Sequence, residues 1–292
     1  MHGSHRQAVD LPALLPGVIV RALARGNDSS MIIFPLYENS PPADARQVTP
    51  AWKSIEDRQH QRTPSCLLIA QPDHAHLAGD IASQFDSPDF PTLPVAVVEA
   101  IRLHDEGWAP VDGLAPDLKV QLINGAPKSF LNFSPDDFLV CWRRSIERAE
   151  KVAPTGGFIV SRHFVALAQY RLNITHDGEQ HRENLEEFVV NETFRQHYLL
   201  NTLHATEHEL DYFLHALQFC DVLSLYLCSG VPENVSFAQV FNGRSVTLQR
   251  VGRNYVLNPS PFRAPVRVSV KALPFENGKL DRTAVELWWE LR

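Results

Sequence analysis

The chain has 292 residues, 44% of them hydrophobic and 21% charged, an ordinary globular composition with ample material for a buried core. Its net charge is -7 and its pI is about 6.0, and no run of Lys or Arg stands out, so no overall field draws it to nucleic acid or anionic lipid. The four cysteines contain no C-x-x-C pair, which argues against a disulfide framework and favours a reducing, cytoplasmic compartment.

The N-terminal part of the chain carries few helix signals. Residues 1–30 are predicted to be a flexible extension, and the run from Leu11 to Val20 is too short and too rich in proline to span a membrane. Residues 32–36 favour a short strand. Residues 38–64 are polar and proline-rich, so we expect mostly loop there.

From Pro72 onward the spacing of apolar residues is typical of amphipathic helices. Pro72 suits a first helical turn, Gly107 suits a helix end, and Ser134 with Asp137 three residues later indicates a capped start. The predicted helices cover about residues 72–85, 93–106, 135–152, 158–170, 183–204 and 207–229. Residues 109–135 lack a period and are expected to form a long loop.

The pattern changes after Gly230. Residues 246–257 alternate between apolar and polar and carry a turn at Gly252, as a hairpin does, and residues 266–272 alternate again. The sequence therefore predicts a mainly α fold in one domain over residues 31–292. Its helical body would cover about 65–230, and a small C-terminal antiparallel β appendage about 240–292.

Asp221 is the most informative candidate site residue. Its neighbours at helical spacing include Leu214, Leu217 and Leu225, so a helix would carry this carboxylate into the core. Burying an unpaired carboxylate costs several kcal/mol. A metal ion, an Arg partner or a raised pKa would each compensate for that cost.

Histidines fall on the inner faces of the other predicted helices. His74 aligns with Leu77, whereas His76 should point outward, and His163 continues the face of Ile159. Taken alone, an inward histidine is more often a hydrogen-bonded core residue than a metal ligand.

The pair His104-Asp105 closes a helix whose inner face is Val97, Val98 and Ile101. A helix C-terminus favours a histidine, so this dipeptide by itself is a weak signal. Together with the other positions it completes the series His, His-Asp, His, Asp on four separate helices, an arrangement that can form a metal cage inside a helix bundle.

This order resembles the HD-domain superfamily of metal-dependent phosphohydrolases. More closely, the chain is similar to an uncharacterised HD-like family, the domain of unknown function numbered 3891. The resemblance starts near residue 65 and rests on the segments Leu67–Gly79, Ile101–Trp108, Ser161–His163, Asp221–Leu225 and Asn258–Phe262. It implies an HD-domain-like helical bundle and five metal ligands, His74, His104, Asp105, His163 and Asp221.

The implied function is a metal-dependent hydrolase acting through a metal-bound hydroxide on a small phosphorylated or anionic substrate. Mixed imidazole and carboxylate ligands suit one or two ions of Fe, Mn, Zn or Mg. No cluster of cations marks a phosphate site, and Arg102 and Arg162 are merely near in sequence. No catalytic residue beyond the ligands is identified, and the sequence leaves a homo-oligomer open.

Two alternatives remain. A di-iron oxygenase of the HD type would need one further histidine, for which His197 is best placed, and would act on a small organic substrate. A non-catalytic metal-binding or ligand-sensing protein is the other. The aromatic residues Trp108, Phe130, Trp142 and Phe164 are expected to be core rather than pocket lining.

Overall fold

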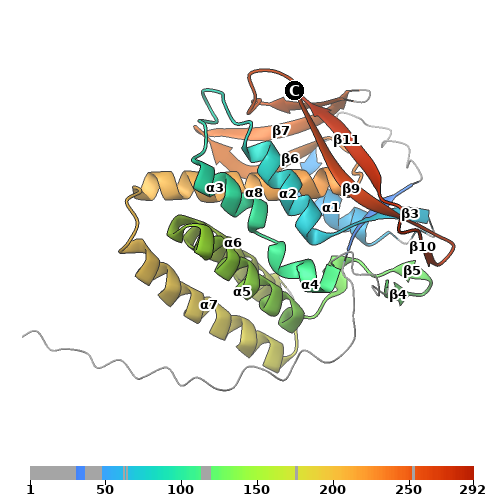
Figure 1. Cartoon of the computed structure of the whole chain (residues 1–292), viewed down its shortest axis with the longest axis horizontal. Coiled ribbons are helices and arrows are strands. Elements are labelled where there is room, and N and C mark those ends of the chain that lie inside the picture. The colour runs from blue at the N-terminus through green and yellow to red at the C-terminus, as the bar shows by residue number, and fades with distance from the viewer. Residues whose placement is uncertain are drawn as a thin grey trace, which may run out of the picture.

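The computed structural model describes residues 31–36, 48–61, 63, 65–112, 120–174, 177–251 and 254–292. The predicted flexible extension and the predicted turn at Gly252 lie outside these residues. Figure 1 shows a layer of helices beneath a curved sheet, with strands from both ends of the chain in that sheet.

Six long helices lie where the apolar period predicts them. They are α2 (Gln71–Ala82), α3 (Val95–Leu103), α5 (Pro135–Val152), α6 (Pro154–Ile174), α7 (Glu179–Leu200) and α8 (Glu207–Cys228). The Ser134 side chain accepts a hydrogen bond from the Asp137 backbone at the start of α5, as predicted. Thr206 and Glu209 form a reciprocal capping box at the start of α8.

Helix α1 (Ala51–Gln59) corrects the prediction of loop over residues 38–64. Its buried positions 51, 54, 55, 58 and 59 follow helical spacing. Three of them are Ser, Arg and Gln, so the sequence shows no apolar helical pattern there. Gln59 satisfies its burial by exchanging two hydrogen bonds with the backbone of Ile33 and by donating to Ser229. The predicted loop over 109–135 also contains short elements: α4 (Ala109–Asp112), η2 (Phe130–Asn132) and the small β4–β5 hairpin (Leu122–Ile123 and Ala126–Pro127).

The strands form a nine-stranded mixed sheet. Its order is β1 (Ile32–Pro35), β3 (Ser65–Ile69), β9 (Val266–Glu276), β11 (Val285–Leu291), β8 (Asn254–Asn258), β7 (Arg244–Val251), β6 (Val235–Phe241) and β2 (Thr49–Pro50), with β10 (Lys279–Leu280) paired to β9. Two pairs, β11 with β8 and β2 with β6, are parallel, and the others are antiparallel. The predicted strands at 32–36 and 266–272 and the predicted hairpin at 246–257 are parts of this sheet.

The prediction of a mainly α, HD-domain-like helical bundle with a small C-terminal antiparallel β appendage is wrong. The sheet is a large half-barrel layer, and its β3–β9 pairing joins the N-terminal and C-terminal parts of the chain. The prediction named no strand at β2, β3, β6, β10 or β11. Strands β3 and β9 pair although about two hundred residues separate them in the sequence. No local sequence pattern predicts such a pairing.

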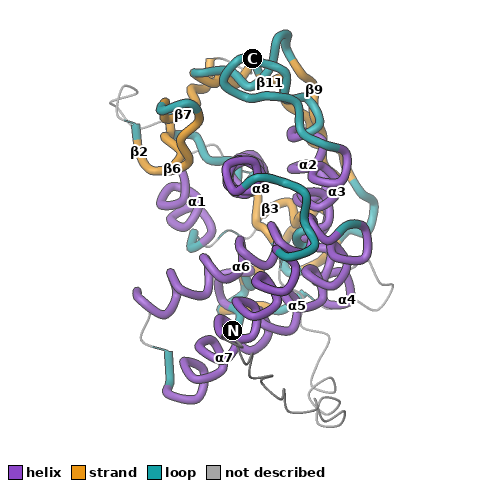
Figure 2. Tube along the Cα trace, turned by 90° about the vertical axis from the view of Figure 1, so that its left-hand side faces the viewer, coloured by secondary structure: helices purple, strands orange, loops and turns teal. Residues whose placement is uncertain are grey.

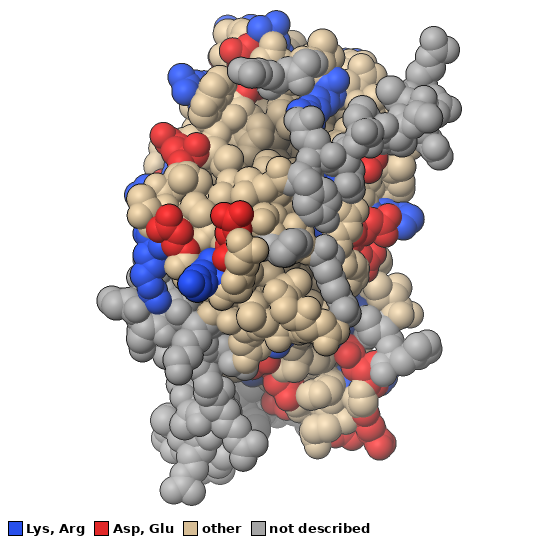
Figure 3. Space-filling model, turned by 90° about the vertical axis from the view of Figure 1, so that its right-hand side faces the viewer, with Lys and Arg blue, Asp and Glu red and all other residues tan. Residues whose placement is uncertain are grey.

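Helix α8 lies between the two layers. In Figure 2 it is seen along its axis, with strands arching over it and α5, α6 and α7 beneath. Its buried residues therefore surround the helix, as expected for a helix covered on all sides. On the outer face drawn in Figure 3, acidic and basic side chains of the described residues are interspersed, and neither sign forms a patch.

Candidate metal centre

The five predicted site residues come together in the interior. Their exposed fractions are 0% for His74 on α2, 1% and 9% for His104 and Asp105 after α3, 3% for His163 on α6, and 7% for Asp221 on α8. Four separate chain segments thus deliver three imidazoles and two carboxylates to one place.

The turn that carries His104 and Asp105 is fixed by close packing. The 3-10 helix η1 (Glu106–Trp108) follows it, and the Gly107 amide donates to the Ser145 hydroxyl on α5 at 2.9 Å. A Cβ atom at position 107 would lie 2.0 Å from the Cys141 carbonyl oxygen, so glycine is required for this approach. Close packing is thus what requires a glycine here, since α3 already ends at Leu103 and Gly107 lies inside η1 and not at the predicted helix end.

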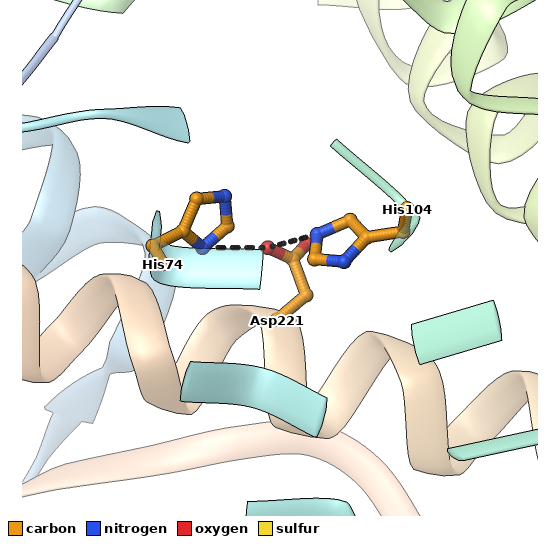
Figure 4. Close-up of side chains that lie close together, drawn as sticks. All are labelled: His74, His104 and Asp221. Atoms are coloured by element: carbon orange, nitrogen blue, oxygen red, sulfur yellow. Dashed lines mark hydrogen bonds and ion pairs between the residues drawn. The ribbon is translucent and has the colours of Figure 1, made fainter. Parts of the chain in front are cut away.

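The distances within the cluster are short. His74 Nε2 lies 2.9 Å from Asp105 Oδ2, and His104 Nε2 lies 3.3 Å from Asp221 Oδ1. His163 Nε2 lies 3.5 Å from Asp221 Oδ2, and His104 Nε2 lies 3.8 Å from Asp105 Oδ2. One ligand atom each of His74, His104 and Asp221 lies within 4.8 Å of the others, so this buried group could hold a metal ion (Figure 4).

Hydrogen bonds outside the cluster fix the protons on two of the imidazoles. His104 Nδ1 lies 2.7 Å from the Ile101 carbonyl oxygen and must donate to it. The Ser224 hydroxyl donates to the Asp221 carbonyl at 2.8 Å, so at its 3.0 Å contact with His74 it accepts from Nδ1. Both histidines therefore turn a bare Nε2 lone pair toward the carboxylates when neutral.

This proton arrangement fits a cation. A lone pair of His74 faces Asp105 at 2.9 Å, and a lone pair of His104 faces Asp221 at 3.3 Å. Two acceptors at such distances repel each other unless a proton or a metal ion lies between them. Imidazoles whose other nitrogen is held by a carbonyl or hydroxyl are the usual form of histidine ligands.

In the metal-free protein, the pKa values of Asp221 and His104 also reflect the close approach of imidazoles and carboxylates. Burial alone would raise the pKa of Asp221, but the hydrogen bond from His104 and the neighbouring imidazoles lower it to about 2. Burial alone would lower the pKa of His104, but the charges of Asp105 and Asp221 raise it to about 9. A proton on His104 thus takes the place that a metal cation would occupy.

His163 differs from the other two histidines. Burial lowers its pKa to about 4, and the attraction of Asp221 does not offset this. Its Nδ1 atom is buried and has no hydrogen-bond partner within the described part of the chain. An unpaired buried nitrogen costs free energy. The Nδ1 atom of a neutral His163 is therefore available for a hydrogen bond with a bound group.

A cavity of about 760 Å³ adjoins the cluster, and Asp105, His163 and Asp221 line it. The aromatic residues Trp108, Phe130, Trp142 and Phe164 also line it, although all four are buried and part of the core clusters. These four side chains belong both to the core and to the cavity wall. The sequence pattern alone does not distinguish a residue buried in the core from one that also lines a cavity.

Several predicted orientations can be compared with the structure. His76 is half exposed, as predicted. His197 is exposed on α7, and its apolar neighbours Val190 and Phe194 are 52% and 71% exposed, so the inner face expected for it is wrong. Helix α7 packs against α6 through other positions, among them Leu185 and Phe188.

The two arginines near the site motifs are engaged elsewhere. Arg102 pairs with Asp80 at 2.8 Å, and Arg162 pairs with Asp211 at 2.8 Å. Neither lines the cavity.

Sequence reasoning missed two residues that support the cluster. Ser224 orients His74, and its position one turn after Asp221 among leucines was an available signal. Trp108 donates its indole N–H to Asp105 Oδ1 at 3.2 Å, which holds one oxygen of that carboxylate.

The structure thus defines a protein with a mixed sheet over a helical layer and a buried His/Asp group able to hold a metal ion. Residues 58–275 match the model of the family described as Protein of unknown function (DUF3891), and the chain belongs to this family. No curated protein and no solved structure matches the chain. None of the described helices is both long and apolar enough to cross a membrane.

Proposed function

We propose that this protein is a metal-dependent hydrolase whose ion or ion pair is held by His74, His104, Asp105, His163 and Asp221. The observation that carries the proposal is the set of imidazole lone pairs facing buried carboxylates at the end of a 760 Å³ cavity. A cation reconciles these acceptors, and the cavity gives a substrate access to it. The set of mixed N and O donors suits Fe, Mn, Zn or Mg.

A bound divalent ion would lower the pKa of a water molecule so that hydroxide is available near neutral pH. The chain's own residues provide the setting for that chemistry. Ile101, Ser224 and Trp108 hold His104, His74 and Asp105 in fixed orientations by hydrogen bonds. His163 would contribute Nε2, which faces Asp221 Oδ2 at 3.5 Å, and burial keeps this imidazole neutral by lowering its pKa to about 4.

The proposed substrate carries one phosphate-like or other anionic group at the cluster. The two carboxylates would repel an anionic substrate unless the bound ions carry more positive charge than the carboxylates carry negative charge. This condition favours a pair of divalent ions over one. Hydrolysis adds the water oxygen to the electrophilic centre, breaks the bond to the leaving oxygen, and returns a proton to that oxygen.

A di-iron oxygenase is the second candidate, and the aromatic cavity wall is the observation that favours it. A cavity with a mostly apolar lining suits an organic substrate. His197 does not supply the extra ligand, because it lies exposed on α7. This candidate must therefore use the same five residues as the hydrolase.

Metal analysis of the native protein followed by parallel assays separates these candidates. We expect at least one transition metal or Mg²⁺ per chain, and hydrolysis of phosphomonoesters or carboxylic esters that stops with a chelator and returns with added metal. Iron near two per chain with oxygen consumption and no hydrolysis would favour the oxygenase. Bound metal with neither activity would favour a non-catalytic metal-binding or sensing protein.

Asp221→Asn provides the matched test of the ligand set. The substitution keeps the shape of the side chain and removes the charge that the imidazoles face, so we expect the metal affinity to fall by more than about a hundredfold. Asp211→Asn, on the same helix but paired with Arg162 at the surface, is the control and should keep its metal. Equal metal content in both variants by elemental analysis would contradict the proposed centre.

A further inference from the structure

The wall of the cavity beside the cluster is largely aromatic. Trp142 and Phe164 stack with ring centroids 5.1 Å apart and planes 16° apart. Phe138, which is partly exposed, packs against Trp142 at 5.4 Å and edge-on to Trp108 at 5.1 Å. These rings form an apolar part of the cavity wall that a ligand at the cluster would contact.

The outer part of the cavity is also apolar. Tyr170 and Ile174, one turn apart at the end of α6, line the cavity and are 49% and 53% exposed. Trp52 on α1 lines it as well and is partly buried. Apolar side chains thus line the solvent-exposed part of the cavity as well as the part beside the cluster.

Positive charge contributes little to this cavity. Of the described lining residues, Lys53 and Arg171 are the two that carry a full positive charge. Lys53 pairs with Asp57 at 2.8 Å, and Arg171 makes two bonds to Asp177 at 2.9 and 3.1 Å while lying over the Phe138 ring. A multiply charged ligand such as a nucleotide would find no cluster of cations here.

Two glutamine amides line the cavity next to the cluster. Gln71 precedes His74 by three residues on α2, and Gln218 precedes Asp221 by three residues on α8, so each shares a helix face with a cluster residue. Gln71 is only 2% exposed and Gln218 is partly buried, and within the described part of the chain no hydrogen bond to either side-chain amide is found. Because both amides line the cavity, they are available to a polar group of a ligand.

We infer that the cavity binds an organic molecule with a flat aromatic body and a single oxyanion-bearing head group, with the head group held at the cluster by the amides of Gln71 and Gln218. The molecule would be the substrate of the proposed hydrolase, and only its reaction rests on that proposed function. The binding itself follows from the cavity wall and the amides. Gln71 and Gln218 would position the head group, and the aromatic wall would select the body.

Binding of simple probes tests the inference without any turnover. Titration calorimetry would compare 2-naphthoate, which has body and head, with acetate, which has the head alone, on metal-loaded and on chelator-treated protein. We expect 2-naphthoate to bind at least about a hundredfold more tightly than acetate in both states, because the body buries apolar area in either. Acetate or inorganic phosphate binding as tightly as 2-naphthoate would overturn the inference.

Two variants locate the binding. Ala166→Phe places a ring in the cavity from α6 and should abolish 2-naphthoate binding, whereas Ala96→Phe, on α3 and outside the cavity lining, should leave it unchanged. Gln71→Met keeps the length of the side chain and removes the amide. It should weaken 2-naphthoate binding about tenfold and leave naphthalene binding unchanged.

The outcomes separate the two proposals. Binding of 2-naphthoate without any hydrolysis would leave the ligand class intact and remove the hydrolase. Hydrolysis without preference for aromatic bodies, or a Gln71→Met variant that loses naphthalene and naphthoate equally, would remove the ligand class and leave the hydrolase. Circular dichroism of each variant verifies that it is folded.

Discussion

Asp221 and Asp105 are the residues whose burial needs an explanation. Two carboxylates in the interior are tolerated because three imidazoles face them, and hydrogen bonds from Trp108 and to Ser224 and Ile101 hold the set in place. Helical spacing placed His74, His163 and Asp221 on apolar helix faces. The resemblance to a known family implied the full set of five, with His104 and Asp105 at a helix end. The supporting residues escaped it, because a buried serine among leucines is more often a local helix bond than part of a site.

Ser224 gives a prediction at the scale of single residues. Ser224→Ala removes the acceptor of the His74 Nδ1 proton, so His74 can turn or change tautomer, and we expect the metal affinity to fall about 10- to 100-fold. Competition with a chromophoric chelator measures this. Ser229→Ala is the control, because Ser229 is a buried serine that bonds Gln59 instead, and an equal loss of affinity there would contradict the role of Ser224.

At the scale of elements, α6 and α7 are joined through a buried carboxylate. Glu192 on α7 accepts from the Ser161 hydroxyl on α6 at 2.9 Å and pairs with Arg195 at 3.0 Å. Burial nevertheless raises the pKa of Glu192 above its ordinary value of 4.5, so the charged form is less favourable in the folded protein than in the unfolded chain.

Glu192 therefore gives a pH-dependent stability with a definite sign. Its raised pKa stabilises the fold fully below pH 4.5, and this contribution is lost as the pH rises through the folded-state pKa. Glu192→Gln removes the titration, so the stability of the variant relative to the natural protein should increase between pH 4 and pH 7. Urea unfolding at both values measures it. A relative stability that falls with pH would show that the Arg195 pair outweighs the desolvation.

At the scale of the whole molecule, the sheet connects both ends of the chain across α8. Strand β11 lies between β9 and β8, so a segment of seven residues near the C-terminus completes the middle of the sheet. The family match ends at residue 275, before this strand. The fold therefore depends on residues that the match does not cover.

Truncation after Asp281 tests this dependence. The shortened chain would leave β9 and β8 without their shared partner. It would also lose the buried side chains of Trp289 and Leu291 and expose the core surface that they cover, so we expect loss of the cooperative thermal transition. Differential scanning calorimetry measures the outcome. A native-like transition within a few degrees of the full chain would show that β11 is dispensable.

Helix α8 shows which structural features a local sequence pattern predicts. Its period and the placement of Asp221 on an inner face both follow from residues within about one turn of each other, and the structure agrees with them. The same holds for α2, α5 and α6. The polar buried face of α1 and the outward face of α7 near His197 departed from expectation, because burial there depends on neighbours distant in sequence.

The sequence by itself determined the six long helices and the inward direction of His74, His163 and Asp221, because helical periodicity is a property of adjacent residues. Only the tertiary structure decided the nine-stranded sheet, the aromatic cavity and the proton arrangement of the cluster. Each of these arises where segments far apart in the chain meet, and the free energy of such contacts is not encoded in any one of the segments.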